Sequence, residues 1–154
     1  MPRFELTLET PIGRLLLCAD ADALTEIRFD AGEARTDASP VLEQAERELR
    51  EYFAGVRKAF SVPISPKGTP FQRRVWDALR GIPYGETVSY GEVARRIGSP
   101  RACRAVGMAN HRNPIPIVIP CHRVIGADGG MTGYGGGLEI KKILLELEGI
   151  HVKV

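Results

Sequence analysis

Apolar and polar residues alternate near the start of the chain in a way that predicts β-strands. The segment FELTLE alternates strictly, and two further apolar segments follow it, RLLLCA and LTEIRF. An interval of two residues places apolar side chains on one face of a strand. Pro11 and Gly13 break the pattern after the first segment, and acidic residues separate the other two. Three strands are therefore predicted within the first thirty residues.

Helical spacing replaces this alternation from residue 39 onward. Ser39 is a typical N-cap residue, and Pro40 behind it suits the first position of a helix. One face of the predicted helix carries an apolar series, namely Leu42, Ala45, Leu49 and Tyr52/Phe53. The segment 60–68, FSVPISPKG, is rich in proline and polar residues, which predicts a linker between two domains.

Three short helices are predicted after this linker. The first begins with the capping-box pattern Thr69-Pro-Phe-Gln72, and its apolar stripe is expected at Phe71, Val75, Ala78 and Leu79. The second begins with the same pattern at Ser89 and Glu92. The turn 98–100, Gly-Ser-Pro, is expected to end the second helix and to cap the third, which runs to about Asn110.

Two short helices joined by a tight turn form the pattern of a helix-turn-helix, whose second helix would carry Arg101 and Arg104. Residues 67–112 hold nine Lys/Arg against three Asp/Glu, whereas residues 1–66 hold eight against twelve. Such a basic block is a common sign of nucleic-acid contact. Helix pairs in protein cores and solvated basic surfaces look similar, so the pattern alone leaves both interpretations open.

The region after the basic block is apolar but interrupted by prolines. Residues 113–125, NPIPIVIPCHRVI, are expected to be buried, non-helical and rigid, with Pro120 fixing the backbone before Cys121. A glycine-rich loop with Tyr134 follows. Helical spacing then returns in LEIKKILLELEG, where a core stripe is expected at Ile140, Ile143/Leu144 and Leu147.

The tetrapeptide Pro-Cys-His-Arg at 120–123 is the motif that carries chemistry. A cysteine reacts as the thiolate, and a nearby imidazole and cation favour that anion. Neighbours on a strand point to opposite faces, so His122 would need a turn or a bridging water to take the proton of Cys121. The dipeptide also fits a small buried cysteine beside a partly exposed histidine. Cys18 and Cys103 lack this context and are expected to be small packing residues.

Several classes of protein are excluded by composition. The three cysteines are not spaced as CxxC pairs, so neither a disulfide framework nor a cysteine-rich zinc site is expected. Residues 1–66 contain one cysteine and no histidine, and His111 and His151 have no metal-binding pattern. No apolar segment approaches the roughly 20 residues that cross a bilayer, and no signal peptide is visible. We expect no metal, no membrane contact and a cytoplasmic location.

Residues from about 69 to 149 resemble the active-site domain of the O6-alkylguanine-DNA alkyltransferases, also called methylated-DNA–protein-cysteine methyltransferases. The matching stretches keep the order and spacing of the family, and RAVGMAN is similar to its bacterial members. They are TPFQRRVWDALRGIPYGETVSYGEVARRIG, RAVGMANHRNPIPIVIPCHRVIG and TGYGGGLEIKKILLELEG. The resemblance implies an α+β protein. Residues 1–62 would form a small antiparallel sheet with a helix, and residues 67–154 a mostly helical domain with the helix-turn-helix and the cysteine loop.

The resemblance also implies roles for individual residues around the thiol. Cys121 would accept an alkyl group, His122 would act on it through a water, and Glu148 would hold His122 in the useful tautomer. Asn113 would brace the loop around the cysteine. Lys141 occupies a further active-site position of the family.

Other residues are implied to contact the DNA. Tyr90 would hydrogen-bond the guanine ring and give a proton to the leaving base. Arg104 would enter the duplex as the target nucleotide flips out. Arg101 and Ala105 would accompany it at the DNA surface.

A substrate pocket is implied by a third group of residues. Pro116 would pack on the base, Tyr134 would cover it, and the carbonyls of Cys121 and Val124 would accept from the guanine amino group. The N–H of Gly135 would face O6. Relatives often have serine or alanine at this position, and glycine gives the loop more freedom, so a looser pocket that admits bulkier alkyl groups is expected.

The resulting prediction is a monomeric, cofactor-free, single-turnover DNA-repair enzyme. It would act on double-stranded DNA containing O6-alkylguanine, with O4-alkylthymine as a further candidate substrate. The main alternative is an alkyltransferase-like protein, which binds the lesion but lacks the acceptor cysteine. A winged-helix regulator would leave the Pro-Cys-His-Arg motif without purpose, and a cysteine hydrolase would not need Arg104 on a recognition helix.

Overall fold

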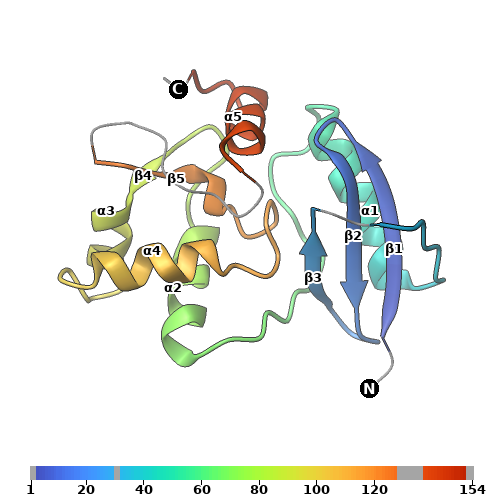
Figure 1. Ribbon diagram of the computed structural model, residues 1–154, viewed down its shortest axis with the longest axis horizontal. Coiled ribbons are helices and arrows are strands. Elements are labelled where there is room, and N and C mark those ends of the chain that lie inside the picture. The colour runs from blue at the N-terminus through green and yellow to red at the C-terminus, as the bar shows by residue number, and fades with distance from the viewer. Residues whose placement is uncertain (1–2, 30–31, 128–136, 152–154) are drawn as a thin grey trace. The chain divides into compact units, whose positions relative to one another are not determined.

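A computed structural model describes residues 3–29, 32–127 and 137–151 of the 154-residue chain. The chain forms two compact units, residues 1–67 and residues 68–154, which are described separately (Figure 1). All but two short strands lie in the first unit, and helices dominate the second. The expected α+β class, with the sheet first, is confirmed.

The first unit contains an antiparallel sheet formed by the three predicted strands. Their order is β1 (Phe4–Thr10), β2 (Gly13–Ala19) and β3 (Leu24–Arg28). Leu6 and Leu8 of β1 pair with Leu17 and Leu15 of β2, and all four are buried. Because side chains alternate along a strand, these leucines share one face of the sheet.

Helix α1 (Pro40–Phe53) packs against all three strands of this sheet. The Ser39 side chain accepts a hydrogen bond from the N–H of Leu42, which is the predicted N-cap. The predicted apolar face is buried at Leu42, Ala45, Leu49 and Tyr52. Together the helix and the leucine face of the sheet form the core of the first unit.

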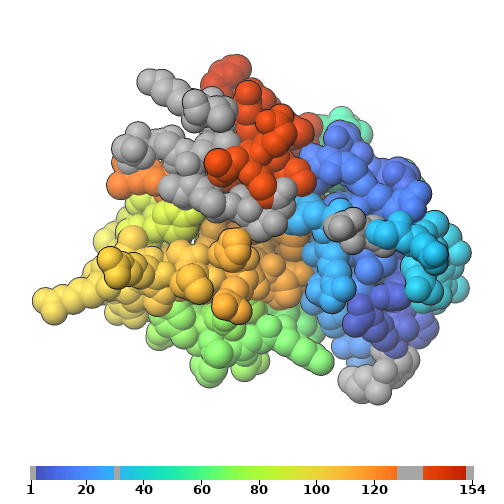
Figure 2. Space-filling view, viewed as in Figure 1, coloured from blue at the N-terminus to red at the C-terminus, as the bar shows by residue number. Residues whose placement is uncertain are grey.

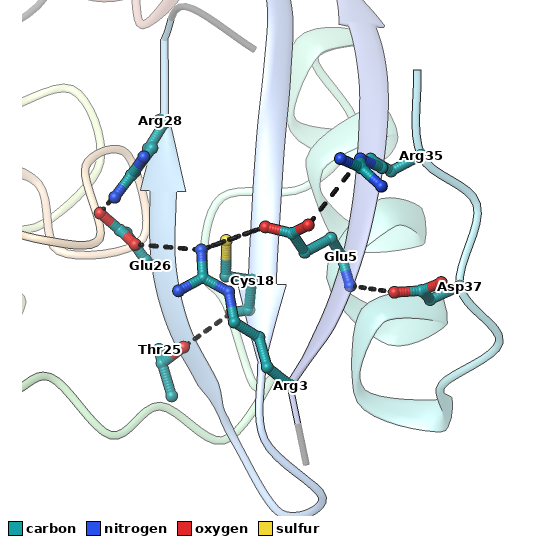
Figure 3. Close-up of polar contacts among 8 residues, drawn as sticks. All are labelled: Arg3, Glu5, Cys18, Thr25, Glu26, Arg28, Arg35 and Asp37. Atoms are coloured by element: carbon teal, nitrogen blue, oxygen red, sulfur yellow. Dashed lines mark hydrogen bonds and ion pairs between the residues drawn. The ribbon is translucent and has the colours of Figure 1, made fainter. Parts of the chain in front are cut away.

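The opposite face of the sheet carries charged side chains around one buried thiol (Figure 3). Cys18 lies between Glu5 and Glu26 in the strand register, and Arg3 Nη2 is 3.3 Å from its Sγ. Burial raises the pKa of the Cys18 thiol, against the lowering effect of Arg3. Cys18 is therefore a packed, protonated thiol at neutral pH, as its sequence context predicted.

The proposed linker is wrong for residues 61–65, which pack onto the first unit. The N–H of Leu24 donates to Pro63 O and its carbonyl accepts from Ser65 N, both at 2.9 Å, so this segment bridges the free edge of β3. The buried Glu48 carboxylate accepts from Ser61 N at 2.9 Å and Val62 N at 3.1 Å. Proline-rich composition indicated a loop here but carried no information about these anchors.

The second unit consists of helices around two short strands. The strands β4 and β5 pair in parallel, with Val88 opposite Val124. Its elements are α2 (Pro70–Arg80), β4 (Val88–Ser89), α3 (Tyr90–Arg96), α4 (Cys103–His111), the 3-10 turn η1 (Cys121–Arg123), β5 (Val124–Ile125) and α5 (Leu138–Leu147).

Helix α2 begins with the predicted capping box, in which Thr69 and Gln72 each accept from the other's N–H. Its stripe differs from the prediction, because Trp76 is buried while Phe71 and Ala78 are half-buried. The Trp76 Nε1–H donates to the Ala109 carbonyl of α4 at 2.8 Å. This bond satisfies the buried indole and ties α2 to α4.

The two helices of the predicted helix-turn-helix are present, but their ends differ in detail. Ser89 caps α3 as expected, whereas the Glu92 carboxylate pairs with Arg95 and Arg96 instead of completing a capping box. The third helix does not begin at Ser99-Pro100. Residues 99–102 form a turn that is closed by Ala102 N donating to Ser99 O, and Pro100 occupies the second position of this turn, which proline favours. Helix α4 starts only at Cys103.

Two further expectations about the second unit are wrong. Cys103 is exposed rather than packed. In α5 a purely apolar stripe was predicted, but the buried face also contains two charged residues. It consists of Lys141, Leu144, Leu145 and the C-cap residue Glu148. An apolar pattern cannot identify a face on which two charged residues have buried partners.

Candidate active site

Cys121 lies at the start of η1, a single 3-10 turn. The turn is closed by Arg123 N donating to Pro120 O at 3.0 Å. Cys121 is 4% exposed and His122 is fully buried. The segment was expected to be non-helical throughout, which is wrong for these three residues. At three residues per turn, the side chains of Cys121 and His122 leave the backbone about 120° apart instead of on opposite faces, as they would on a strand.

His122 is held by Glu148, the residue that caps the end of α5. The His122 Nε2 to Glu148 Oε2 distance is 2.7 Å, and both side chains are fully buried. An ionised carboxylate only accepts hydrogen bonds, so Nε2 carries the proton in this pair and Nδ1 keeps its lone pair. Among the described residues, His122 Nδ1 has no hydrogen-bond partner although it is buried. The imidazole is therefore arranged to accept a proton at Nδ1.

Opposing charges surround this imidazole. Burial lowers the pKa of His122, the Glu148 carboxylate raises it, and the Arg123 and Lys141 cations lower it again. The net direction is downward, so His122 is neutral at neutral pH. A neutral imidazole can act as a base.

Lys141 projects from α5 into the interior and is fully buried. Its Nζ donates to the Val124 carbonyl at 2.7 Å. Burial lowers the pKa of Lys141 to about 8, and the charge of Cys121 opposes that shift. The ammonium group thus persists at neutral pH and interacts with Cys121 electrostatically, which favours the thiolate.

Asn113 joins the two ends of the loop before Cys121. Its Nδ2 donates to Ile119 O at 2.8 Å, and its Oδ1 accepts from Ile115 N at 3.0 Å. Within the loop, Ile117 has a positive φ of 76°, a strained conformation for a β-branched residue. Asn113 thus holds the two ends of this loop together.

Two residues of this site were missed in the sequence. Asn110, buried on α4, donates from Nδ2 to the Cys121 carbonyl at 3.4 Å. Arg123 donates to both oxygens of Glu148, from Nε at 2.8 Å and from Nη2 at 3.0 Å. Arg123 belongs to the quoted motif, and a buried arginine beside a histidine could have been recognised there. Asn110 is the last residue of the quoted stretch RAVGMAN, so the resemblance could have pointed to it, although an asparagine by itself is typical of a surface.

The structure places the predicted DNA-contacting residues around α4. Arg101, Arg104 and Ala105 are exposed, while Val106 and Ala109 on the same helix face the core. Tyr90 is half-buried at the start of α3. Its ring lies beside Gly107 of α4, where a methyl group in place of the glycine hydrogen would be 4.0 Å from it. Figure 2 shows α4 and the turn before it, coloured yellow to orange, on the surface facing the viewer.

The predicted pocket residues are only partly described. Pro116 is buried in the loop before Cys121, and Val124 is buried in β5. Tyr134 and Gly135 lie outside the described residues. Within the described ranges, no group of three or more His, Cys, Asp or Glu side chains could hold a metal ion. None of the described helices is long and apolar enough to cross a membrane.

Fold and site together define a class of protein, in which a helix-turn-helix DNA-binding domain carries a buried cysteine, histidine and glutamate. Residues 70–150 match the family model of the 6-O-methylguanine DNA methyltransferase DNA binding domain, and residues 4–66 match its ribonuclease-like domain. The chain belongs to the 6-O-methylguanine DNA methyltransferase family. The resemblance seen in the sequence is confirmed.

Full-length relatives agree with this assignment. The methylated-DNA–protein-cysteine methyltransferase of Methanosarcina acetivorans is 51% identical over 92% of this chain and 95% of its own. The constitutive one of Bacillus subtilis is 48% identical over 96% of each. The crystal structure of Mycobacterium tuberculosis OGT in complex with DNA superposes with a TM-score of 0.87, at 50% identity over 94% of this chain and 92% of that one. The protein is thus a DNA-binding methyltransferase of DNA repair, as predicted.

Proposed function

We propose that the protein repairs O6-alkylguanine in double-stranded DNA by moving the alkyl group onto Cys121, once per molecule. The observation that carries this proposal is the buried Cys121–His122–Glu148 arrangement in a domain whose α4 presents exposed arginines. The chemistry needs only a thiolate and a proton donor. We therefore propose that no cofactor takes part. We also propose that the protein is a monomer and works in the cytoplasm.

The proposed reaction begins when the Cys121 thiol loses its proton to His122 Nδ1 through a bridging water. The thiolate then attacks the alkyl carbon, and a carbon–sulfur bond forms as the carbon–O6 bond breaks. The electron pair of the broken bond stays on guanine, which takes a proton from the Tyr90 hydroxyl. The product is a thioether, which water does not cleave, so each molecule reacts once.

DNA must deform for this reaction to occur. The O6 position lies in the major groove of a stacked duplex, where no enclosing pocket can surround it. Flipping the nucleotide exposes it at a cost of a few kcal/mol, and an inserted side chain can fill the gap. Arg104, exposed on α4, is the proposed inserted residue, with Arg101 and Ala105 beside it.

The flipped base would be recognised by backbone groups near Cys121. The Val124 carbonyl already accepts from Lys141 Nζ, but a carbonyl oxygen has two lone pairs and can accept a second bond from the guanine amino group. Lys141 would thus position this acceptor. Pro116 would pack on the base, Tyr134 would cover it and the Gly135 N–H would face O6. O4-alkylthymine is a further proposed substrate.

The proposal is tested by weighing the intact protein after incubation with a duplex oligonucleotide that contains O6-methylguanine. We expect one added methyl group, saturating at one equivalent of DNA and located on the Cys121 peptide. An unmodified protein that still binds the duplex would instead identify a passive lesion reader. Repeated turnover would identify a hydrolase.

Arg104→Ala is expected to slow methyl transfer by about 10- to 100-fold, which corresponds to about 1–3 kcal/mol of lost stabilisation of the flipped state. Single-turnover rates on duplex DNA measure the effect. Arg80→Ala, which removes an exposed arginine at the end of α2, is the matched control and should react at nearly the wild-type rate. Equal losses in both variants would contradict the insertion role.

A further inference from the structure

Arg123 is a buried arginine that donates to three oxygen atoms of two residues. Its Nε and Nη2 bind the two oxygens of Glu148, and its Nη1 donates to the Ile82 carbonyl at 2.7 Å. The guanidinium also lies 5.8 Å from the centre of the Tyr84 ring. A planar guanidinium that forms two parallel bonds to a carboxylate fixes both groups in orientation.

Among the described residues, four groups donate hydrogen bonds to the Glu148 carboxylate. Oε1 accepts from Arg123 Nε and from Gly85 N at 3.1 Å, and Oε2 accepts from Arg123 Nη2 and from His122 Nε2. Gly85 has a positive φ of 81°, which glycine adopts without strain. Four donors occupy all the lone-pair positions of a carboxylate. Glu148 is therefore held as an anion that can neither rotate away from His122 nor take its proton.

Charge is the second consequence of this arrangement. The charged groups that act on His122 are Glu148 and Lys141 of the last helix and Arg123 of its own turn, and Lys141 interacts electrostatically with Cys121 as well. A buried carboxylate alone would stabilise an imidazolium and fill Nδ1 with a proton before the reaction. The adjacent guanidinium offsets that negative charge. The pKa of His122 is lowered and not raised, chiefly because burial opposes the charged imidazole, while Arg123 and Lys141 offset part of the raising effect of Glu148.

We propose that Arg123 is a positioning residue that clamps Glu148 and offsets its charge, so that His122 remains a neutral base for Cys121 in the resting protein. This inference rests on the proposed function of Cys121 as the nucleophile. It separates two tasks: Glu148 orients the imidazole, and Arg123 keeps it free to accept the thiol proton.

The test measures thiolate formation without DNA. Iodoacetamide modifies thiolates, and peptide mass spectrometry gives the rate at Cys121 from pH 4.5 to 9. The wild-type rate should fall on an acid limb that lies below the ordinary His pKa of about 6.5. In Arg123→Gln the limb should move up by about one pH unit, so that the rate below it falls about tenfold. In Glu148→Gln the limb should move down.

Arg123→Lys is the matched control, because it keeps the charge but loses the two-pronged geometry. Its limb should stay at the wild-type position while its plateau rate falls. The exposed Cys103 is an internal reference whose profile should not change in any variant. A folded Arg123→Gln protein with an unshifted limb overturns the proposal. If that variant does not fold, an Arg123→Lys limb displaced upward overturns it.

The alkylation profiles and the methyl-transfer assay together separate this proposal from the proposed function. A limb that moves as expected, in a protein that never gains a methyl group from O6-methylguanine, would refute the repair function and leave the role of Arg123 intact. Methyl transfer by wild type, together with an unshifted limb in Arg123→Gln, would refute only the role of Arg123.

Discussion

Cys121→Ser is expected to abolish methyl transfer while leaving the affinity for lesion-containing DNA close to that of the wild type. The substitution exchanges one sulfur for a smaller oxygen at a buried position, so the fold and the exposed surface of α4 should persist. A serine hydroxyl is far less acidic than a thiol, and His122 alone cannot generate a comparable anion at neutral pH. Mass spectrometry measures transfer, and a salt titration of binding measures affinity, which should fall as salt rises.

Cys18→Ser is the matched control for this experiment. Cys18 is also buried, but it lies in the first unit and its pKa is raised by burial. We expect this variant to gain one methyl group at the wild-type rate. Methyl transfer by Cys121→Ser, or its loss in a folded Cys18→Ser protein, would place the acceptor elsewhere.

Glu48→Ala is expected to lower the free energy of unfolding by about 3–5 kcal/mol. The substitution leaves the N–H of the buried Val62 without an acceptor, which costs about 1–3 kcal/mol, and it also removes the acceptor of Ser61 N and the charged partner of Arg57. The side chain of Gln44 loses its shorter hydrogen bond and keeps the one to Ser61 Oγ. Urea unfolding followed by far-UV circular dichroism measures the change. Glu48→Gln, which retains one acceptor oxygen, should lose clearly less.

The pH dependence of this difference has a definite sign. Burial raises the pKa of Glu48, but hydrogen bonds from Gln44, Ser61 and Val62 outweigh it, so the pKa lies below its ordinary value of 4.5. A group whose pKa is lowered by folding stabilises the protein above its unfolded pKa and loses this effect as pH falls through the folded pKa. The stability gap between wild type and Glu48→Gln should therefore be full at pH 7 and close below pH 4.5. A constant gap would show that the carboxylate charge is irrelevant.

Local sequence rules predicted which helices and strands form better than they predicted the residues at which these elements begin and end. Capping at Ser39, Thr69 and Ser89 was correct because each depends on residues within one helical turn. The start of α4 was wrong because Ser-Pro suits a helix start and a turn equally well. The anchoring of residues 61–65 depends on Leu24 and Glu48, which are distant in the chain. Such contacts leave no periodic signal.

The candidate site shows the same division. The motif at 120–123 identified Cys121 and His122 directly, and the family resemblance pointed to Glu148, which lies 2.7 Å from His122. Arg123 was overlooked because arginine is normally read as a surface residue. Its burial becomes visible only when the end of α5 and the Ile82 carbonyl are brought to it. Buried charge is set by tertiary pairing, which residue type alone does not reveal.

Trp76 gives this molecule an optical label of its own. It is the only tryptophan in the sequence, and its indole is fastened to the Ala109 carbonyl. The next residue, Asn110, contacts the carbonyl of the reactive cysteine. We therefore expect the emission of this indole to change both when the protein docks on a duplex and when a carbon group reaches the sulfur, so that the two events can be timed in one cuvette without attaching a dye.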